Sequence, residues 1–372
     1  MNRTLLGGLS APAFLRRHWQ KTPLLVRGAL PGFAGLLELR DMIELAGRDD
    51  CESRLIVRNG RNWTVEHGPF ASSLLRRLPS RNWTLLVQGV DLFLPQARQL
   101  LSQFSFIPYS RLDDLMVSYA PDGGGVGPHF DSYDVFLLQG PGRRRWQVSR
   151  QEDLTLREHI ALKILKHFRP EGEAVLDPGD MLYLPPQFAH DGIAVGDCYT
   201  YSIGFRAASH RELASEFLMF LEERLRLPGR YADPDLSIQK HPAQIGPAMI
   251  RKIGRTLRGI RWSSNDIVEF LGSYLTEPKQ QVRFMPPSRP LAFAAFSRAA
   301  RRKGVRLSPG SQMLYSGTRF FINGESAGAD AAPEALRRLA NDRGLPGRRF
   351  PRHGSAELLY QWYRAGYISI NA

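Results

Sequence analysis

Cysteine is scarce in this sequence, and long apolar runs are missing. Its two cysteines, Cys51 and Cys198, lie far apart and outside any C-x-x-C pattern, which excludes a disulfide scaffold and a cysteine-rich zinc site. We interpret them as buried free thiols in a reducing compartment. No apolar run approaches the roughly 18 residues that a membrane span needs. The N-terminus has no sustained apolar core before Arg16 and Arg17, which argues against secretion. We expect a cytoplasmic protein without a membrane segment.

Acidic residues are also few relative to basic ones. The chain has 36 Asp and Glu against 50 Lys and Arg, a net charge of +14. The excess is concentrated: from Glu277 to the C-terminus there are 16 basic residues and 6 acidic ones. A basic terminal quarter indicates contact with RNA, or with a partner surface that normally faces RNA. The alternative is an arginine-rich surface that water alone solvates.

Repeats and low-complexity tracts are absent, so the domain organisation must come from pattern. A chain of 372 residues is long enough for two or three domains. Residues 1–100 mix helical stretches, such as 36–45, with strand-like runs, such as the one that begins at Trp83. Residues 113–206 are short apolar runs separated by Gly and Pro clusters, the pattern of an all-β barrel or sandwich. Only 149–172 interrupts this pattern, with a helix-like insert.

The pattern changes at Ser209. Ser209 and Glu212 match a capping box, and apolar residues follow at helical spacing, so we predict helices over 209–275. The apolar stripe consists of Leu213, Phe217, Phe220 and Leu221. By default such a stripe packs on its own chain.

A second break is the Pro-rich stretch 278–290, and the tail after it is typical of a winged-helix module. The expected elements are helices over 291–303, 333–341 and 355–365, a hairpin over 313–325 and a closing strand that starts at Tyr367. We therefore predict three regions: a mainly β catalytic domain over 1–208, an all-α region over 209–277 and a winged-helix-like α+β domain over 278–372.

The strongest chemical signal is His129-Phe130-Asp131. In a strand, residues i and i+2 point to one face, so an imidazole nitrogen and a carboxylate oxygen would converge on one point. His190 follows a Gly-Asp turn, a short strand and a rigid Pro185-Pro186 stop. A closed barrel can bring these strands together. Two histidines and one carboxylate leave three octahedral positions open, the arrangement of non-haem Fe(II) oxygenases.

Arg144 is the second signal. After the turn at Gly140-Pro141-Gly142, alternation puts Arg144 on the apolar face of the strand with Trp146 and Val148. An unpaired buried guanidinium is costly, and a ligand carboxylate would satisfy its bidentate fork. 2-Oxoglutarate carries such a carboxylate. If the alternation is shifted by one residue, Arg144 is instead solvated.

Three further polar side chains accompany this pattern. Ser118, just before the glycine run, could donate a hydroxyl hydrogen bond to the same carboxylate. Thr200 and Ser202 share the small, polar face of a later strand with Arg206, so that strand is a further candidate for the pocket wall.

With these residues in place, the chain resembles the JmjC-type oxygenases, and among them the bacterial ribosomal oxygenases that hydroxylate an arginine of a large-subunit ribosomal protein. The similarity is carried by residues 115–146, which include GPHFD and GPGRRRW, by GDMLYLPPQFAH (179–190) and by YSIGFRA (201–207). The segment from Phe14 to Leu24 also resembles the opening of that family. The GPHFD and GPGRRRW segments are far more specific than a bare His-x-Asp.

The resemblance implies a double-stranded β-helix of the cupin type, a helical dimerisation region and a winged helix. It implies Fe(II) held by His129, Asp131 and His190, 2-oxoglutarate held by Arg144 and Ser118, and O₂ as co-substrate. It further implies a homodimer in which the stripe of Leu213, Phe217, Phe220 and Leu221 packs against its copy in the partner chain. The substrate it implies is an arginine of the ribosomal protein uL16. Sequence physics alone does not distinguish arginine from histidine hydroxylation.

A cationic substrate should meet acidic side chains near the mouth of the pocket. The candidates are Asp122 and Asp134, which flank the metal motif. We include them with Arg206 as candidate substrate-binding residues.

Two other functions stay open. A metal cupin that does not use 2-oxoglutarate is disfavoured by the inward Arg144, and succinate release would decide. A non-catalytic barrel that only docks on RNA or ribosomes is disfavoured by the complete ligand set, and anaerobic iron binding would separate it from an enzyme.

Overall fold

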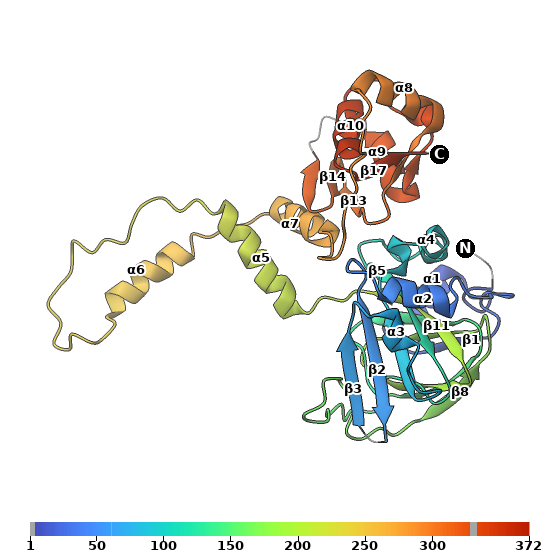
Figure 1. The fold of residues 1–372 in the computed structure, drawn as a ribbon. Coiled ribbons are helices and arrows are strands. Elements are labelled where there is room, and N and C mark those ends of the chain that lie inside the picture. Colours follow the sequence, from blue (N-terminus) through green and yellow to red (C-terminus); the bar gives the residue numbers. More distant parts are fainter. Residues whose placement is uncertain (1–3, 61, 328–332, 372) are drawn as a thin grey trace.

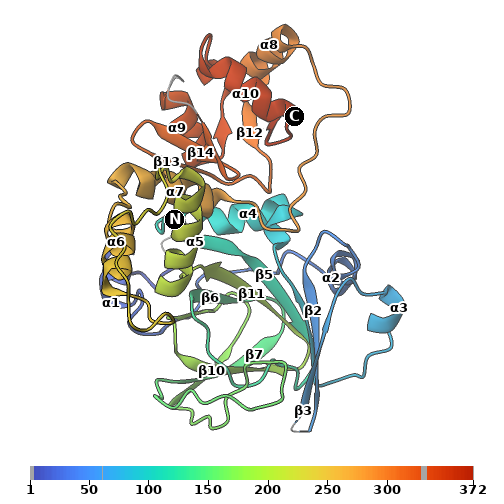
Figure 2. The same ribbon diagram turned by 90° about the vertical axis from the view of Figure 1, so that its left-hand side faces the viewer.

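The computed structural model describes residues 4–60, 62–327 and 333–371. Its N-terminal half contains two antiparallel sheets that face each other (Figures 1 and 2). The larger has the strand order β1-β9-β6-β11-β5-β4-β2-β3 and the smaller the order β10-β7-β8. The strands are β1 (Leu24–Val26), β2 (Ser53–Asn59), β3 (Asn62–His67), β4 (Trp83–Val87), β5 (Leu112–Ala120), β6 (Asp134–Gln139), β7 (Arg143–Ser149), β8 (Gly172–Leu176), β9 (Met181–Leu184), β10 (Ala189–Val195) and β11 (Cys198–Phe205).

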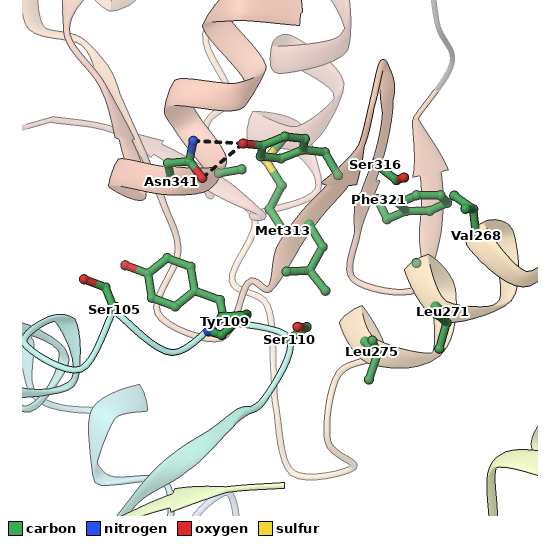
Figure 3. Close-up of a pocket in the computed structure, with 15 residues that line it drawn as sticks. Ser105, Tyr109, Ser110, Val268, Leu271, Leu275, Met313, Ser316, Phe321 and Asn341 are labelled. Carbon is green, nitrogen blue, oxygen red and sulfur yellow. Dashed lines mark hydrogen bonds between the residues drawn. The ribbon is translucent and has the colours of Figure 1, made fainter. Parts of the chain in front are cut away.

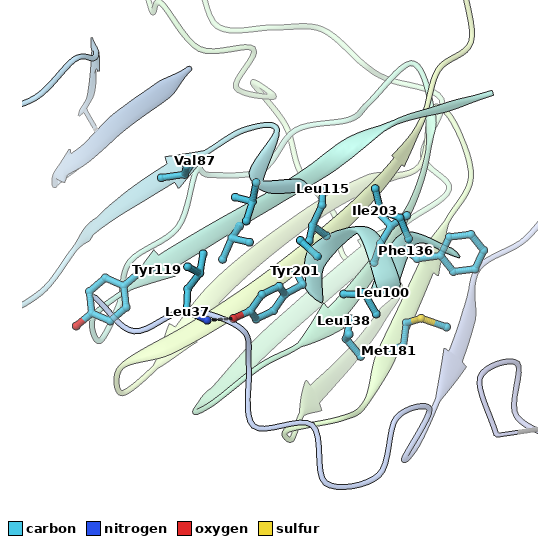
Figure 4. Packing of buried hydrophobic residues seen from close by; sticks show 14 of the residues in the cluster. Leu37, Val87, Leu100, Leu115, Tyr119, Phe136, Leu138, Met181, Tyr201 and Ile203 are labelled. Atoms are coloured by element: carbon cyan, nitrogen blue, oxygen red, sulfur yellow. Dashed lines mark hydrogen bonds between the residues drawn. The ribbon is translucent and has the colours of Figure 1, made fainter. Parts of the chain in front are cut away.

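The outer face of the large sheet carries the main hydrophobic core, part of which Figure 4 shows. Strand alternation produces this division: Leu115 and Val117 of β5 belong to the core, whereas Met116 and Ser118 line the interior between the sheets. Helices α1 (Ala11–Arg17), α2 (Leu39–Ala46) and α4 (Pro95–Ser102) contribute to the core on this outer side. Burying each large apolar side chain stabilises the fold by about 1.5–3 kcal/mol. The interior face carries polar residues beside a smaller apolar cluster between the two sheets, which includes Val135, Leu137 and Trp146.

The prediction of a helix-like insert over 149–172 is wrong. Between β7 and β8 the chain forms a loop with one isolated bridge, Leu156 to Leu165. His159 has a left-handed φ of +61°, which interrupts any helix at that point. The apolar spacing that suggested a helix instead buries Ile164 and Leu165 against the barrel.

After β11 the chain forms α5 (His210–Arg224), α6 (Pro247–Leu257) and α7 (Ser264–Thr276). Ser209 caps α5 as predicted, because its side chain accepts a hydrogen bond from the backbone N–H of Glu212. The α5 stripe packs within the chain: the Phe217 and Phe270 rings lie 5.2 Å apart between α5 and α7. Helix α6 lies at the end of a long arm that extends away from the rest of the molecule (Figure 1), and none of its residues is buried.

The last region has its own hydrophobic core. The helices, hairpin and closing strand predicted for it are confirmed. Its helices are α8 (Phe293–Lys303), α9 (Pro333–Asp342) and α10 (Ser355–Arg364), and its short 3₁₀ turn is η2 (Gly347–Arg349). Its strands are β12 (Val305–Leu307), β13 (Met313–Ser316), β14 (Arg319–Ile322), β15 (Glu325–Ala327), β16 (Gly344–Leu345) and β17 (Ile368–Ile370).

Helix α7 joins this region to the barrel. A largely apolar cavity of about 570 Å³ lies between α7, the loop at residues 105–110 and β13 (Figure 3). Leu271 and Leu275 of α7 line one wall and Met313 lines another. Tyr315 and Asn341 also line the cavity, and the Asn341 side-chain amide donates a hydrogen bond to the Tyr315 hydroxyl.

Both cysteines are buried and free, as predicted. In the part of the chain that the structure describes, no helix is long and apolar enough to cross a bilayer.

Candidate metal centre and its pocket

The first two predicted ligands meet directly. His129 and His190 form an isolated antiparallel bridge, with His129 N–H donating to His190 C=O at 2.9 Å and the reverse bond at 2.8 Å. The expected strand at His129 is therefore a single bridge residue. The two imidazole centroids lie 4.2 Å apart. A pair of backbone hydrogen bonds thus fixes the spacing of the two rings.

Asp131 completes the cluster. One ligand atom from each of His129, Asp131 and His190 lies within 4.8 Å of the other two, so these residues could hold one metal ion. The Asp131 carbonyl accepts the backbone N–H of Gln187 at 2.8 Å. This bond ties the acid to the turn that precedes His190.

The imidazoles are oriented for metal binding. His129 Nδ1 lies 2.8 Å from the Gly127 carbonyl and His190 Nδ1 lies 2.9 Å from the Phe188 carbonyl. When each Nδ1 carries the proton that this bond needs, Nε2 keeps a free lone pair for a metal. Burial, assisted by the neighbouring His129, lowers the pKa of His190 to about 4, so its ring is neutral at physiological pH.

The cluster opens into a cavity of about 390 Å³ between the two sheets. Its walls come from both sheets and from the loop between β7 and β8. Besides the three candidate ligands, the lining includes Ser118, Arg144, Trp146, Thr200 and Ser202.

Arg144 lies on this interior face, as the alternation predicts. It is buried, and its guanidinium carbon lies 5.7 Å from the centre of the Trp146 ring. Among the described residues, nothing forms a hydrogen bond with its Nε or Nη2. A buried cation with two unsatisfied nitrogen atoms requires an anion, and two parallel N–H groups suit a carboxylate.

Ser118 and Thr200 lie opposite each other on β5 and β11, and both are buried. The Thr200 hydroxyl also has no hydrogen-bond partner in the described chain. Hydroxyl groups that line a cavity beside an unsatisfied guanidinium can donate further hydrogen bonds to a ligand carboxylate.

The three predicted substrate-binding residues lie elsewhere. Asp122 forms an ion pair with Arg81 at 2.8 Å, and Asp134 is buried under Tyr183 and Gln20, which both donate hydrogen bonds to it. Arg206 pairs with Glu212 at 2.8 Å at the start of α5. Among the described residues, the lining of the cavity includes none of the three.

The acids that do line the cavity are Asp113 and Asp114, together with Asp131. Lys279, from the segment after α7, lies 2.8 Å from Asp113 Oδ1 and 3.2 Å from Asp114 Oδ2. Burial raises the pKa of Asp114 to about 6 despite the opposing effect of Lys279. Sequence reasoning missed this pair, although counting back from Ser118 in steps of two leads to Met116 and Asp114.

A His-Asp-His cluster and a buried arginine without an anion line one cavity between the two sheets. This combination defines a cupin-type oxygenase of the JmjC class. Comparison with known proteins agrees: residues 99–213 match the JmjC domain family and residues 259–369 match the ROXA-like winged helix. The ribosomal protein uL16 3-hydroxylase of Escherichia coli is 34% identical over 92% of this chain and 91% of its own length. A probable ribosomal oxygenase of Haemophilus influenzae is 44% identical over 52% of this chain and 48% of its own.

Solved structures give the same result. The X-ray structure of E. coli ycfD superposes with a TM-score of 0.87 at 33% identity and covers 98% of each chain. A second structure of that ribosomal oxygenase, in complex with cobalt and 2-oxoglutarate, has a TM-score of 0.84 at 32% identity and covers 98% of this chain and 99% of its own. This chain belongs to the JmjC-domain ribosomal oxygenase family, and the predicted fold class and enzyme class are confirmed.

Proposed function

We propose that this protein is an Fe(II)- and 2-oxoglutarate-dependent hydroxylase that acts on an arginine of the ribosomal protein uL16. The observation that carries the proposal is the buried Arg144 guanidinium, which has two unsatisfied nitrogen atoms and lines the same cavity as the His-Asp-His cluster. The similarity to the uL16 3-hydroxylase of E. coli supports the choice of substrate.

The residues fit the groups that the reaction needs. His129, Asp131 and His190 would hold Fe(II), since neutral imidazoles and one carboxylate form the facial ligand set of such enzymes. Arg144 would bind the distal carboxylate of 2-oxoglutarate, with Ser118 as a second donor. When bound, iron, 2-oxoglutarate and O₂ supply the oxidising chemistry that hydroxylates an unactivated carbon.

The protein's contribution is binding, orientation and exclusion of water. Trp146 and the loop over 161–164 line the cavity that contains the cluster. Asp113 and Asp114 offer carboxylates to a substrate guanidinium, and Met116 and Tyr133 line the cavity for its aliphatic part. We therefore assign the substrate cation to this acid pair in place of Asp122 and Asp134.

The two competing functions meet specific objections. A metal cupin without 2-oxoglutarate has no use for a buried arginine that points at the metal cavity. A non-catalytic barrel does not require the double backbone bridge that spaces His129 and His190.

For the whole chain we propose the organisation that the sequence predicts. It comprises a catalytic domain over 1–208, a helical dimerisation region over 209–277 and a winged-helix domain over 278–372, in a homodimer that works in the cytoplasm, where uL16 is made. The basic C-terminal region would contact RNA of the ribosome or of its precursors.

The test is incubation of a synthetic uL16 peptide with the protein, Fe(II) and 2-oxoglutarate under air, followed by tandem mass spectrometry of the peptide. We expect one added oxygen atom on a single arginine, with one succinate released for each hydroxylation. A matched peptide with lysine at that arginine should stay unmodified. Oxygen on a histidine of the peptide would refute the proposed substrate. So would a peptide that stays unmodified by folded, iron-loaded protein.

A further inference from the structure

Two segments of the winged-helix region contain basic residues and no acidic ones. Residues 278–324 hold nine Lys and Arg without one Asp or Glu, and residues 343–356 hold four Arg without an acid. Charged surfaces of soluble proteins normally mix both signs. The two segments therefore concentrate positive charge wherever the fold brings them together.

The fold brings them together at the end of α8. Its last turn carries three consecutive cations, and η2 lies directly against it. At Gly347 an added Cβ would lie 2.3 Å from the Arg301 carbonyl oxygen, so only glycine permits this approach. Arg301 Nη2 also donates a hydrogen bond to the Arg352 carbonyl at 3.4 Å. We call the resulting surface the basic rim, which consists of Arg301, Arg302, Lys303, Arg348, Arg349 and Arg352.

The rim is exposed and lacks compensating charge. All six side chains are exposed, and no carboxylate of the described residues forms an ion pair with any of them. Two other arginines of the same region do have such a partner: Arg319 lies 3.5 Å from Glu269 and Arg338 lies 3.1 Å from Asp342. Cations at a helix C-terminus complement the helix dipole, which explains the three on α8. It does not explain the arginines on η2 and beyond.

We propose that the basic rim binds the phosphate backbone of RNA. Clustered guanidinium groups that form no ion pair with the described carboxylates match a polyanion with regularly spaced charges, and arginine binds phosphate in bidentate fashion. The choice of RNA over an acidic protein rests on the proposed function, because a ribosomal substrate is made to lie against RNA. Helix α8 lies at the end of the winged helix away from the barrel (Figures 1 and 2), so bound RNA leaves the metal cavity open.

The test compares two variants of the full-length protein with the same change in charge. In the rim variant, Arg301, Arg302, Arg348 and Arg349 are replaced by Gln. In the control variant, the replaced residues are the exposed barrel arginines Arg16, Arg17, Arg76 and Arg77. Binding to a fluorescein-labelled RNA hairpin is followed by anisotropy over a KCl series, with poly-glutamate as competitor.

We expect the rim variant to bind the hairpin at least tenfold more weakly than the parent at 100 mM KCl. The slope of log affinity against log salt should fall by up to about 0.9 for each lost phosphate contact. The control variant should stay within about threefold of the parent. Equal weakening by both variants, no binding by the parent, or displacement of RNA by poly-glutamate at equal charge concentration would overturn the proposal.

Hydroxylation of the free uL16 peptide separates the two hypotheses. We expect the rim variant to turn the peptide over at the parent rate, since the rim lies outside the metal cavity. Rim-dependent RNA binding by a parent that hydroxylates no peptide would refute the proposed substrate and leave the rim assignment standing.

Discussion

At the scale of single residues, the charged side chains of the cavity fall into two groups. Asp113 and Asp114 have a partner within the chain, Lys279, whereas two nitrogen atoms of Arg144 have none in the described residues. Burying an unpaired charge costs several kcal/mol, so a fold that keeps Arg144 in this state is built for a ligand. The acid pair is already neutralised in part, and a cationic substrate must share it with Lys279.

Removal of a metal ligand should abolish turnover without unfolding the protein. We expect Asp131→Ala and His190→Ala to lose 2-oxoglutarate decarboxylation, because each removes one of three protein ligands. Succinate release and circular dichroism measure the two effects. His159→Ala, on an exposed loop histidine, is the matched control and should behave like the parent. Parent-like succinate release by either ligand variant would disprove the metal assignment.

Arg144→Ala should raise the 2-oxoglutarate requirement and leave metal binding largely intact. Loss of a buried charge-assisted bidentate contact costs roughly 2–5 kcal/mol, about 30-fold to several-thousand-fold in affinity. Titration of 2-oxoglutarate against succinate formation measures the change, with Arg143→Ala on the exposed face of the same strand as control. An unchanged requirement in Arg144→Ala would remove this residue from the co-substrate site.

Asp114 should make substrate affinity depend on pH. Burial raises its pKa to about 6, and only the ionised form pairs with a guanidinium. The KM for the arginine peptide should therefore rise as pH falls below about 6, by up to about tenfold per unit. Lys279 lowers this pKa, so Lys279→Met should move the rise to higher pH. A KM that is independent of pH between 5 and 8 would exclude Asp114 from the substrate site.

The raised pKa of Asp114 makes the stability of the fold depend on pH in the opposite direction from substrate affinity. The folded state raises the pKa of Asp114, so its contribution to stability is lost as pH rises through about 6. Asp114→Asn removes the buried charge and can still accept the Gly89 N–H bond. At pH 8 we expect this variant to melt no lower than the parent while its KM for the peptide rises. A lower melting temperature would show that Asp114 is mainly structural.

At the scale of elements, the cluster depends on how closely β10 approaches the glycine loop before His129. An added Cβ at Gly125 would lie 2.5 Å from the Gly192 carbonyl oxygen, and neither backbone can yield without moving a histidine. We expect Gly125→Ala to cost about 1–3 kcal/mol of stability and to weaken cobalt binding. Gly172→Ala on β8, where the nearest atom is a Val148 methyl at 3.5 Å, is the control. Unchanged cobalt affinity in Gly125→Ala would show that the loop position is unimportant.

Period-two alternation explains which parts of the site the sequence could predict. It placed Arg144 beside Trp146 on the interior face, and the structure confirms that orientation. The acids were misplaced because Asp122 and Asp134 were chosen for their closeness to His129 along the chain. In a barrel, residues close in sequence to a metal ligand can still point away from the cavity. Asp134 does so, and it accepts hydrogen bonds from Gln20 and Tyr183.

Long-range contacts account for the rest. Lys279 meets Asp114 across 165 positions of sequence, and no local pattern encodes that contact. The helices after Ser209 were predictable because the capping residue and the apolar spacing are local signals. Their packing was not: the α5 stripe could equally have faced the barrel or a partner chain, and it packs on α7.

At the scale of the whole molecule, contacts within a single chain do not explain why the arm that carries α6 forms a helix. This helix has 11 residues and none is buried, and isolated helices of that length are marginal in water. Its apolar residues Met249, Ile250, Ile253 and Leu257 lie on one side and are exposed. Leu218 and Met219 of α5 are exposed as well. A second copy of the chain, related by a two-fold axis, can cover both surfaces with the same contacts.

We therefore predict that the dimer contact is formed by the exposed stripe of α6 and not by the stripe of α5. Substitution of Phe217 and Leu221 would break packing inside the chain. Ile253→Arg instead puts an unpaired charge in the centre of the exposed α6 stripe, and we expect it to yield a folded monomer, because burial of that charge in an interface is costly. Ala248→Arg, on the opposite side of α6, should stay dimeric. Sedimentation at tens of micromolar measures both, and a monomeric parent protein would refute the dimer.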